Sequence, residues 1–298
     1  MSRGRFRFGA HPPSMHRYNA SMPSLYKYIA NPDVVRFLLQ GICKFTPIPE
    51  LNDPSELVPN VIVEEIEASR TRLRKNGYSE NDMSHLRRQG CLFQRLAPQF
   101  QAVNVPETRE QATSRIRSSF FDNVPRLERL LNETAREMSS KVGIFCLSRR
   151  FDSLPMWAHY AANATGLVVE FVDLDDHFRG DDTGVLHRPI PVRYERERMG
   201  VTFDPQSHES LFFAKFQDWS YEQEVRVVMP LTDCRQEPFA GRKLHVFDVP
   251  TRCIARIILG WNIADDKSRA VATQVRTTDA QVQIVQARIA HGHVKLGP

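Results

Sequence analysis

Apolar runs and alternating patterns in the second half of the chain predict a set of β-strands. Residues 142–147 and 167–171 are apolar runs of strand length, rich in β-branched and aromatic side chains. Other segments alternate or are short apolar runs bounded by turn residues, which is also typical of strands. These further strands are expected at residues 25–28, 42–46, 190–194, 244–249, 253–259 and 282–287.

The pattern changes to a helical period between residues 58 and 140. Ile62, Ile66 and Leu73 recur on one helical face, and prolines 98, 106 and 125 divide the segment into about four helices. Shorter helices are predicted after Asn31, closed by glycine at position 41, and over 153–163, 212–216 and 264–275. We therefore expect one α+β domain over residues 24–290, with a single mixed or antiparallel β core and 58–140 as a helical insertion. Residues 1–23, low in aliphatic side chains, are expected to form a flexible basic tail.

Composition indicates an ordinary soluble protein. The 298 residues are 41% hydrophobic and 25% charged, and no window approaches the roughly 18 apolar residues of a membrane span. The N-terminal residues lack the apolar segment of a secretory signal. Five dispersed cysteines without a Cys-x-x-Cys pair argue against a disulfide framework and a structural zinc site, so we expect a cytoplasmic protein without a metal and without a membrane partner. The net charge of +5 favours phosphate-bearing ligands or nucleic acid without choosing between them.

The segment 215–228 combines a strand pattern with paired charges. Val225, Val227 and Val228 predict a strand, whose period of two places Glu222, Glu224 and Arg226 on one face. Two carboxylates and a guanidinium on one strand face form either a solvated ladder or one wall of a site. The residues alone leave both interpretations open, and the rest of the chain favours the site.

Two other segments carry candidate chemistry. The predicted helix near residue 156 places Met156, His159, Tyr160 and Asn163 on one side. A triad of Ser148, His159 and Asp152 is conceivable, but no Gly-x-Ser-x-Gly elbow supports hydrolase chemistry. The Asn52-Asp53-Pro54 turn is either a rigid connection or a loop of a site.

Several short motifs follow one another in an order that resembles a known family. They are Leu25-Tyr26-Lys27-Tyr28, Asn52-Asp53-Pro54-x-Glu56, Cys146-Leu147-Ser148, Met156-Trp157-x-His159-Tyr160-Ala161 and Lys215-x-x-x-Trp219-x-Tyr221-Glu222-x-Glu224-x-Arg226. Together they resemble the bacterial family called domain of unknown function 2971. The opening strand of that family is in turn similar to that of ADP-ribosyltransferases. In this comparison Lys27 takes the first-motif position, Ser148 the second, and Glu222-x-Glu224 the third.

The second resemblance implies an ADP-ribosyltransferase-like split sheet and an enzyme that uses NAD as substrate, with a role in bacterial conflict or phage defence. Glu224 would hold the nicotinamide ribose, Glu222 would orient or deprotonate the acceptor, and Lys27 or Arg226 would meet the diphosphate. Trp157 or Tyr160 would stack on a ring. The implied nucleotide-binding residues are Tyr28, Asn52, Asp53, Ser148, Trp157, His159, Tyr160 and Arg226.

Two other classes of function stay open from the residues. One is a non-catalytic module that senses a nucleotide or nucleic acid through a basic cleft. The other is a metal-dependent nuclease or hydrolase in which Asp53, Glu56 and Glu222 hold Mg²⁺. The transferase interpretation requires Lys27, Ser148 and Glu224 to line one cleft. The acceptor, whether protein or nucleic acid, and the oligomeric state are left open.

Overall fold

The computed structural model describes residues 23–53, 63–96, 108–117, 123–196, 210–278 and 281–297. Residues 1–22 of the predicted tail lie outside these ranges, as do Glu56 and Ile62. The strands are β1 (Leu25–Ile29), β2 (Ile42–Lys44), β3 (Thr46–Pro47), β4 (Val142–Ser148), β5 (Leu167–Phe171), β6 (Pro189–Pro191), β7 (Arg193–Glu195), β8 (Ala214–Phe216), β9 (Glu224–Pro230), β10 (Arg235–Phe239), β11 (Arg242–Asp248), β12 (Ile254–Leu259), β13 (Gln283–Ala290) and β14 (His293–Gly297).

The helices are α1 (Val35–Leu38), α2 (Val63–Asn76), α3 (Glu80–Leu96), α4 (Arg109–Ile116), α5 (Val124–Ser140), α6 (Leu154–Tyr160), α7 (Leu174–His177), α8 (Ser210–Phe213) and α9 (Asp265–Arg276). Short 3-10 helices are η1 (Pro32–Val34), η2 (Ile48–Glu50), η5 (Gln217–Glu222), η6 (Leu231–Asp233) and η7 (Thr251–Cys253). Within the described residues, no helix has both the length and the apolar character needed to cross a membrane.

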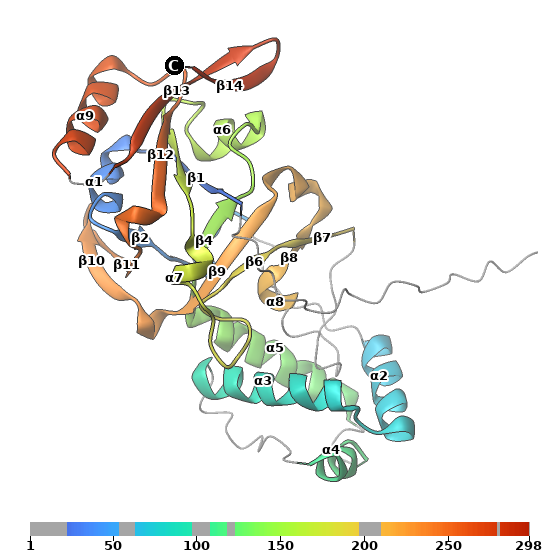
Figure 1. Ribbon diagram of the computed structural model, residues 1–298. Helices are drawn as coiled ribbons and strands as arrows, with labels where there is room; N and C mark the ends of the chain where they lie inside the picture. Colours follow the sequence, from blue (N-terminus) through green and yellow to red (C-terminus); the bar gives the residue numbers. More distant parts are fainter. Residues whose placement is uncertain are drawn as a thin grey trace, which may run out of the picture.

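A nine-stranded sheet forms the centre of the fold (Figure 1). Its strand order is β14-β13-β12-β5-β1-β4-β9-β6, and β3 also pairs with β4. The neighbours are antiparallel except for the parallel pair β12 and β13. Two small sheets, β10-β11-β2 and β7-β8, lie beside it. The predicted α+β class with a mixed, largely antiparallel sheet is therefore confirmed.

The backbone pairing along one edge of β4 is interrupted. Strand β9 pairs with the other edge of β4 along its whole length, from Val142 to Ser148. On the interrupted edge, β1 pairs with β4 at Tyr26 and Ser148, whereas β3 pairs with β4 two strand periods away, at Ile144. Strands β1 and β3 thus diverge along the middle of β4, and a gap opens in the sheet beside Cys146.

Two hydrophobic clusters cover the sheet face that carries Ser148. One joins the aromatic residues of β1 to Trp157 of α6, and the other joins β4 and β9 to helices α3, α5 and α8. The opposite face packs against α1, α9 and β11 in a third cluster. Because a strand alternates its side chains between two faces, the polar residues of β9 lie between the first two clusters.

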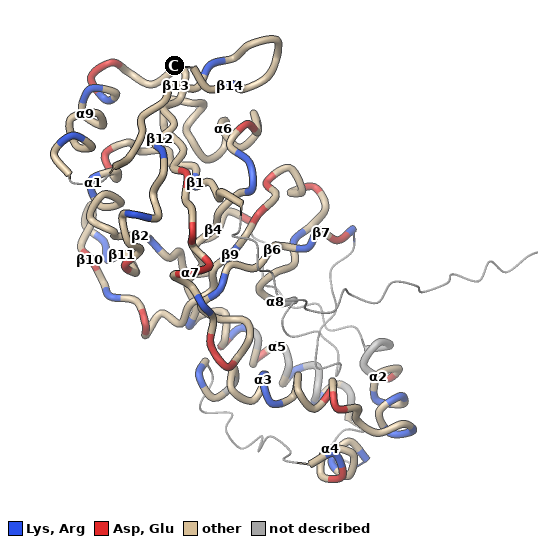
Figure 2. Tube along the Cα trace, viewed as in Figure 1, with Lys and Arg blue, Asp and Glu red and all other residues tan. Residues whose placement is uncertain are grey.

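In the described part of residues 58–140, the predicted helical pattern appears as helices α2, α3, α4 and α5. Helices α2 to α4 share a small core of their own that includes Leu73 and Ile116. Leu92 and Leu96 of α3 and Met138 of α5 pack on the sheet instead. Lys and Arg residues recur along α2, α3 and α4 (Figure 2).

Local sequence signals explain the first elements. Asn31 caps η1 by accepting a hydrogen bond from the backbone of Asp33 at 3.0 Å. Gly41 ends the following turn with a φ of +79°, and an added Cβ there would lie 2.9 Å from the carbonyl oxygen of Val249. The predicted closing glycine at position 41 is therefore confirmed.

Several predicted boundaries are wrong. Helix α6 ends at Tyr160, before three left-handed residues from Ala162 to Ala164, so Asn163 is not on the helix. The expected strand at 190–194 is divided between β6 and β7, and the expected helix at 212–216 becomes α8 followed by β8. Strands β10 and β14 were not predicted. β10 is polar along much of its length, and β14 is an edge strand that pairs only with β13 in the described sheet.

Candidate active site

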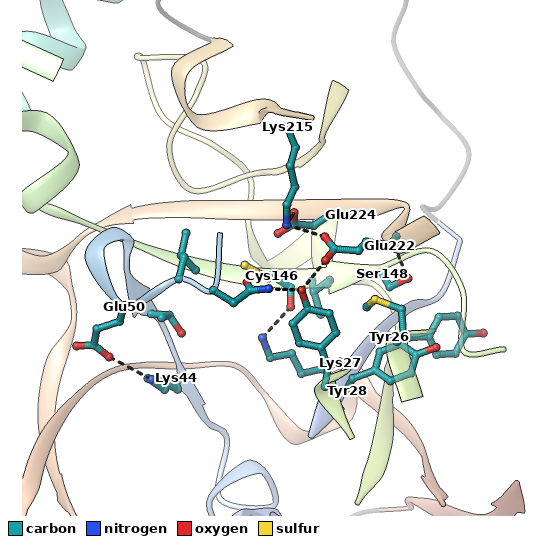
Figure 3. A pocket seen from close by; sticks show the side chains of 16 residues that line it. Tyr26, Lys27, Tyr28, Lys44, Glu50, Cys146, Ser148, Lys215, Glu222 and Glu224 are labelled. Carbon is teal, nitrogen blue, oxygen red and sulfur yellow. Dashed lines mark hydrogen bonds and ion pairs between the residues drawn. The ribbon is translucent and has the colours of Figure 1, made fainter. Parts of the chain in front are cut away.

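A cavity of about 280 Å³ occupies the gap beside β4 (Figure 3). β1 and β4 contribute Lys27 and Ser148 to its lining, and the region around β9 contributes Glu222 and Glu224. The loop that follows η2 contributes Asn52. Lys27, Ser148 and Glu224, which the transferase interpretation requires to share one cleft, line the same cavity. Residues from both halves of the sequence meet here because the strand order places β1, β4 and β9 side by side.

The charged residues of this region are buried. Glu222 and Glu224 are 3% and 5% exposed, and Arg226 is fully buried. A solvated ladder requires side chains in water, so that interpretation of the segment is wrong. The prediction that Glu222 shares a strand face with Glu224 and Arg226 is partly wrong as well, because Glu222 ends η5 and does not belong to the strand. Gln223 follows with a left-handed φ of +44° and turns the chain into β9.

Lys215 lies between the two carboxylates. Its Nζ is 2.8 Å from Glu222 Oε2 and 3.6 Å from Glu224 Oε2. Figure 3 shows the lysine pointing toward both carboxylates from β8. Its ammonium also lies 4.6 Å from the ring centre of Trp219. Burial by itself lowers the pKa of Lys215, but the carboxylates of Glu224 and Glu222 outweigh burial and raise it above the ordinary 10.5.

Arg226 holds Glu224 from the next position on the same strand face. Its Nε donates to Glu224 Oε1 at 2.9 Å, and its second terminal nitrogen donates to Oε2 at 2.8 Å. Its first terminal nitrogen donates to the carbonyl of Phe212 at 2.9 Å. The predicted diphosphate contact of Arg226 is therefore wrong, because this guanidinium is buried behind Glu224 and does not line the cavity. Burial and the nearby Glu222 raise the pKa of Glu224, while Lys215 opposes this rise.

Ser148 fixes the turn that carries the two carboxylates. Its hydroxyl donates to the backbone carbonyl of Glu222 at 2.6 Å and accepts from the backbone of Arg150 at 3.2 Å. Ser148 pairs in register with Tyr26 on one side and with Glu224 on the other. Ser148 lines the cavity, but both of its hydrogen bonds are to the backbone, and its predicted contact with a nucleotide stays a prediction.

Lys27 crosses the gap in the sheet. Its Nζ donates to the carbonyl of Cys146 at 2.8 Å, at the point where β1 no longer pairs with β4. An ammonium has three donors, so Lys27 can also bind an anionic ligand in the cavity.

Tyr160 connects the buried carboxylates to the cavity mouth. Its hydroxyl donates to Glu222 Oε1 at 2.5 Å and accepts from Asn52 Nδ2 at 2.6 Å. Burial, together with the hydrogen bond to Glu222 and its charge, raises the pKa of Tyr160. Asn52 and Tyr160 both line the cavity, and their contact with a nucleotide stays a prediction. Asp53 is buried beside them, does not line the cavity and interacts electrostatically with Arg226.

Of the other residues predicted to contact a ligand, Trp157 and His159 do not line the cavity, whereas Tyr28 does. Trp157 is fully buried, donates to the carbonyl of Phe151 at 2.6 Å and packs against Tyr28 and Trp261, so the prediction that it stacks on a ligand is wrong. His159 is exposed on α6 and does not line the cavity. Tyr28 does line the cavity, and its hydroxyl donates a hydrogen bond to the carbonyl of Arg150 at 3.1 Å.

The residues of the conceivable triad do not assemble. The Ser148 hydroxyl donates to the backbone, and Asp152 accepts from Arg150 Nε at 2.7 Å. Among the described residues, no three acidic, histidine or cysteine side chains are placed to hold a metal ion. The proposed magnesium set includes Glu56, which lies outside the described residues.

Sequence reasoning gave no role to Lys215 or Cys146. Lys215 belongs to the charged segment 215–228, and its position shortly before Glu222 was the sequence signal that could have identified it. Cys146 lines the cavity next to Glu224, and burial together with the Glu224 charge raises its pKa well above 9.0. Its thiol therefore stays protonated at neutral pH.

Comparison with known proteins finds a family match. Residues 156–227 match the family described as Protein of unknown function (DUF2971). The resemblance to this family is therefore confirmed over a segment that contains Tyr160, Lys215, Glu222, Glu224 and Arg226. No curated protein and no solved structure matches the chain.

Proposed function

We propose that the protein is an ADP-ribosyltransferase-like enzyme that cleaves the nicotinamide–ribose bond of NAD and transfers the ADP-ribosyl group to an acceptor. One observation carries the proposal: Lys27, Ser148 and Glu224, from three adjacent strands, line one cavity at a gap in the sheet. These are the residues that the comparison with transferases assigns to the three motifs. The gap between β1 and β3 also supports the split sheet expected from that comparison.

The buried carboxylates suit the chemistry of this bond. Its cleavage passes through an oxocarbenium-like state, which a fixed negative charge in a dry site stabilises more than water does. Arg226 holds both oxygens of Glu224 and so fixes the plane of a carboxylate that lines the cavity. Glu224 therefore faces the ribose in the proposed complex.

We infer the arrangement of NAD in the proposed complex from the cavity volume and from the lysines that line the cavity. About 280 Å³ is close to the lower end of small-ligand sites, roughly 300–1,000 Å³, so the nicotinamide ribose enters and the rest of NAD lies across the mouth. Lys27 and Lys44 both line the cavity, and Lys44 forms an exposed ion pair with Glu50, 3.5 Å long. These ammonium groups pair with the diphosphate.

The test uses purified full-length protein and two preparations of NAD, labelled in the nicotinamide or in the adenine ring. Wild type is expected to release nicotinamide and, with a lysate present, to transfer the adenine label. Glu224→Gln keeps the side-chain shape and is expected to lower the release rate by about 10²–10³-fold. A wild-type protein that folds, yet releases no nicotinamide and transfers no label, would contradict the proposal. Salt-sensitive ligand binding that survives Glu224→Gln, without turnover, would favour the sensing module instead.

A further inference from the structure

We propose that Tyr160 relays the acceptor proton to Glu222, and that the acceptor is therefore a neutral hydroxyl group. This inference rests on the proposed function and names the side of the cavity and the class of acceptor that the reaction uses.

Each carboxylate oxygen of Glu222 already accepts a hydrogen bond. Its Oε1 accepts from Tyr160 at 2.5 Å and its Oε2 accepts from Lys215 at 2.8 Å. The Glu222 side chain is only 4% exposed. Glu222 lines the cavity, and a group that already donates to one of its oxygens connects a nucleophile in the cavity to this carboxylate.

Tyr160 is such a group. It is only partly buried and it lines the cavity. A phenol offers one donor and two acceptor sites. Glu222 takes the donor, and Asn52 occupies one acceptor site at 2.6 Å. The second acceptor site can receive the proton of a bound nucleophile on the Asn52 side of the cavity.

The proton transfer balances as follows in the proposed step. The acceptor O–H bond breaks, its proton passes to the Tyr160 oxygen, and the former Tyr160 proton passes to Glu222 Oε1. The acceptor oxygen forms a bond to C1′ of the ribose while the C1′–N bond breaks. The electron pair of that bond neutralises the nicotinamide ring, which leaves, and Glu222 holds the proton.

Two features fit a relay better than a tyrosinate base. The raised pKa of Tyr160 keeps the hydroxyl protonated at neutral pH, so it passes a proton on and does not act as an anion. The short contact to Glu222 gives the proton a direct path to a carboxylate. A carboxylate acceptor has no proton to give and would lie near two buried carboxylates, so this arrangement favours a hydroxyl over a carboxylate as the acceptor.

Asn52 is a positioning residue in this scheme. Its amide donates to the Tyr160 oxygen and so keeps the Tyr160 proton directed at Glu222. Asn52→Asp replaces the donor by an acceptor, which draws the Tyr160 proton away from Glu222. Asn52→Ala only removes the contact, so the relay predicts a larger loss for Asn52→Asp than for Asn52→Ala.

The experiment measures nicotinamide release from NAD by the full-length protein, with methanol or acetate added as the probe acceptor. Wild type is expected to form the methyl ADP-riboside and no acetate ester, and to react more slowly in D₂O. Tyr160→Phe is expected to lower the rate about 10²-fold and to remove most of the D₂O effect, with the KM for NAD unchanged. Tyr221→Phe is the matched control, since Tyr221 adjoins Glu222 in the chain but does not line the cavity.

The outcomes separate the two proposals. An active wild type whose rate and D₂O effect are unchanged in Tyr160→Phe overturns the relay and leaves the proposed function standing. Efficient transfer to acetate overturns the hydroxyl acceptor. No nicotinamide release from folded wild type overturns the proposed function itself. If thermal unfolding shows that Tyr160→Phe does not fold, the comparison of Asn52→Asp with Asn52→Ala decides, and equal losses in these two variants overturn the relay.

Discussion

Arg226 donates two hydrogen bonds to Glu224, at 2.9 and 2.8 Å, from a position one strand period along β9. Both side chains are buried, and the cavity lies beyond the carboxylate. A bidentate contact fixes the plane of a carboxylate, whereas a single contact leaves it free to rotate. The strand therefore carries both the acidic group and the cation that orients it.

Removing Arg226 is expected to destabilise the protein strongly. In Arg226→Met the Glu224 carboxylate stays buried without its main partner, which typically costs about 3–5 kcal/mol in the free energy of unfolding. Urea denaturation measures this loss. Arg235→Met is the matched control, since Arg235 is 40% exposed in its pair with Glu237 and exposed pairs contribute less than about 1 kcal/mol. Equal effects of the two substitutions would show that the buried pair has no special role in stability.

Lys215 gives a dependence on alkaline pH. Its pKa is raised in the folded protein above the ordinary 10.5, so the ammonium stabilises the fold fully below 10.5. That contribution disappears as the pH rises through the folded-state pKa, because the folded protein then loses the proton that it held more tightly. Wild type is expected to be more stable than Lys215→Met near pH 8, and the difference should shrink above 10.5. Urea midpoints across this range measure it. A difference that stays constant with pH would contradict the assigned ion pair.

The left-handed turn at Gln223 is expected to tolerate glycine and to reject a β-branched residue. A φ of +44° is strained for valine, so Gln223→Val should destabilise the protein by about 1–2 kcal/mol. Gln223→Gly should be nearly neutral, because it relieves strain but gains entropy in the unfolded chain. Thermal unfolding of the two variants gives the comparison. A Gln223→Val protein as stable as Gln223→Gly would argue against this turn.

Neighbouring aromatic positions on α6 are expected to behave differently. Trp157 is fully buried and its indole donates to a carbonyl, so Trp157→Ala should cost about 3–5 kcal/mol of unfolding free energy. His159 is exposed, and His159→Ala should stay within roughly 0.5 kcal/mol of wild type. Chemical denaturation of both variants tests the assignment. A small loss for Trp157→Ala would show that its ring is not part of the core.

Local patterns predicted much of the fold because they depend on neighbours in the chain. The apolar runs that became β4 and β5 were recognisable, as was the helical period between residues 58 and 140. The polar β10 was missed because a strand with few apolar residues leaves no periodic signal, whereas the short edge strand β14 does alternate Val294 and Leu296 with polar residues. The boundary between η5 and β9 was also missed, because Gln223 gives no sign in sequence of its positive φ.

The candidate site was predicted in part from the chemistry of single residues and not from local patterns. The carboxylates of Glu222 and Glu224 and the phenol of Tyr160 are groups that commonly take part in catalysis or binding, and all three side chains line the cavity. Sequence alone did not reveal that Arg226 is buried behind Glu224 or that Trp157 belongs to the core. Burial depends on what packs above a side chain, and that covering comes from segments distant in sequence.

By itself, the sequence determined the element types and the residues able to carry charge or hydrogen bonds. Only the tertiary structure decided that β1 and β3 diverge beside Cys146 and that Lys215 lies between Glu222 and Glu224. The physical reason is that local propensity acts over a few residues, whereas strand order and side-chain burial depend on contacts between segments far apart in the chain.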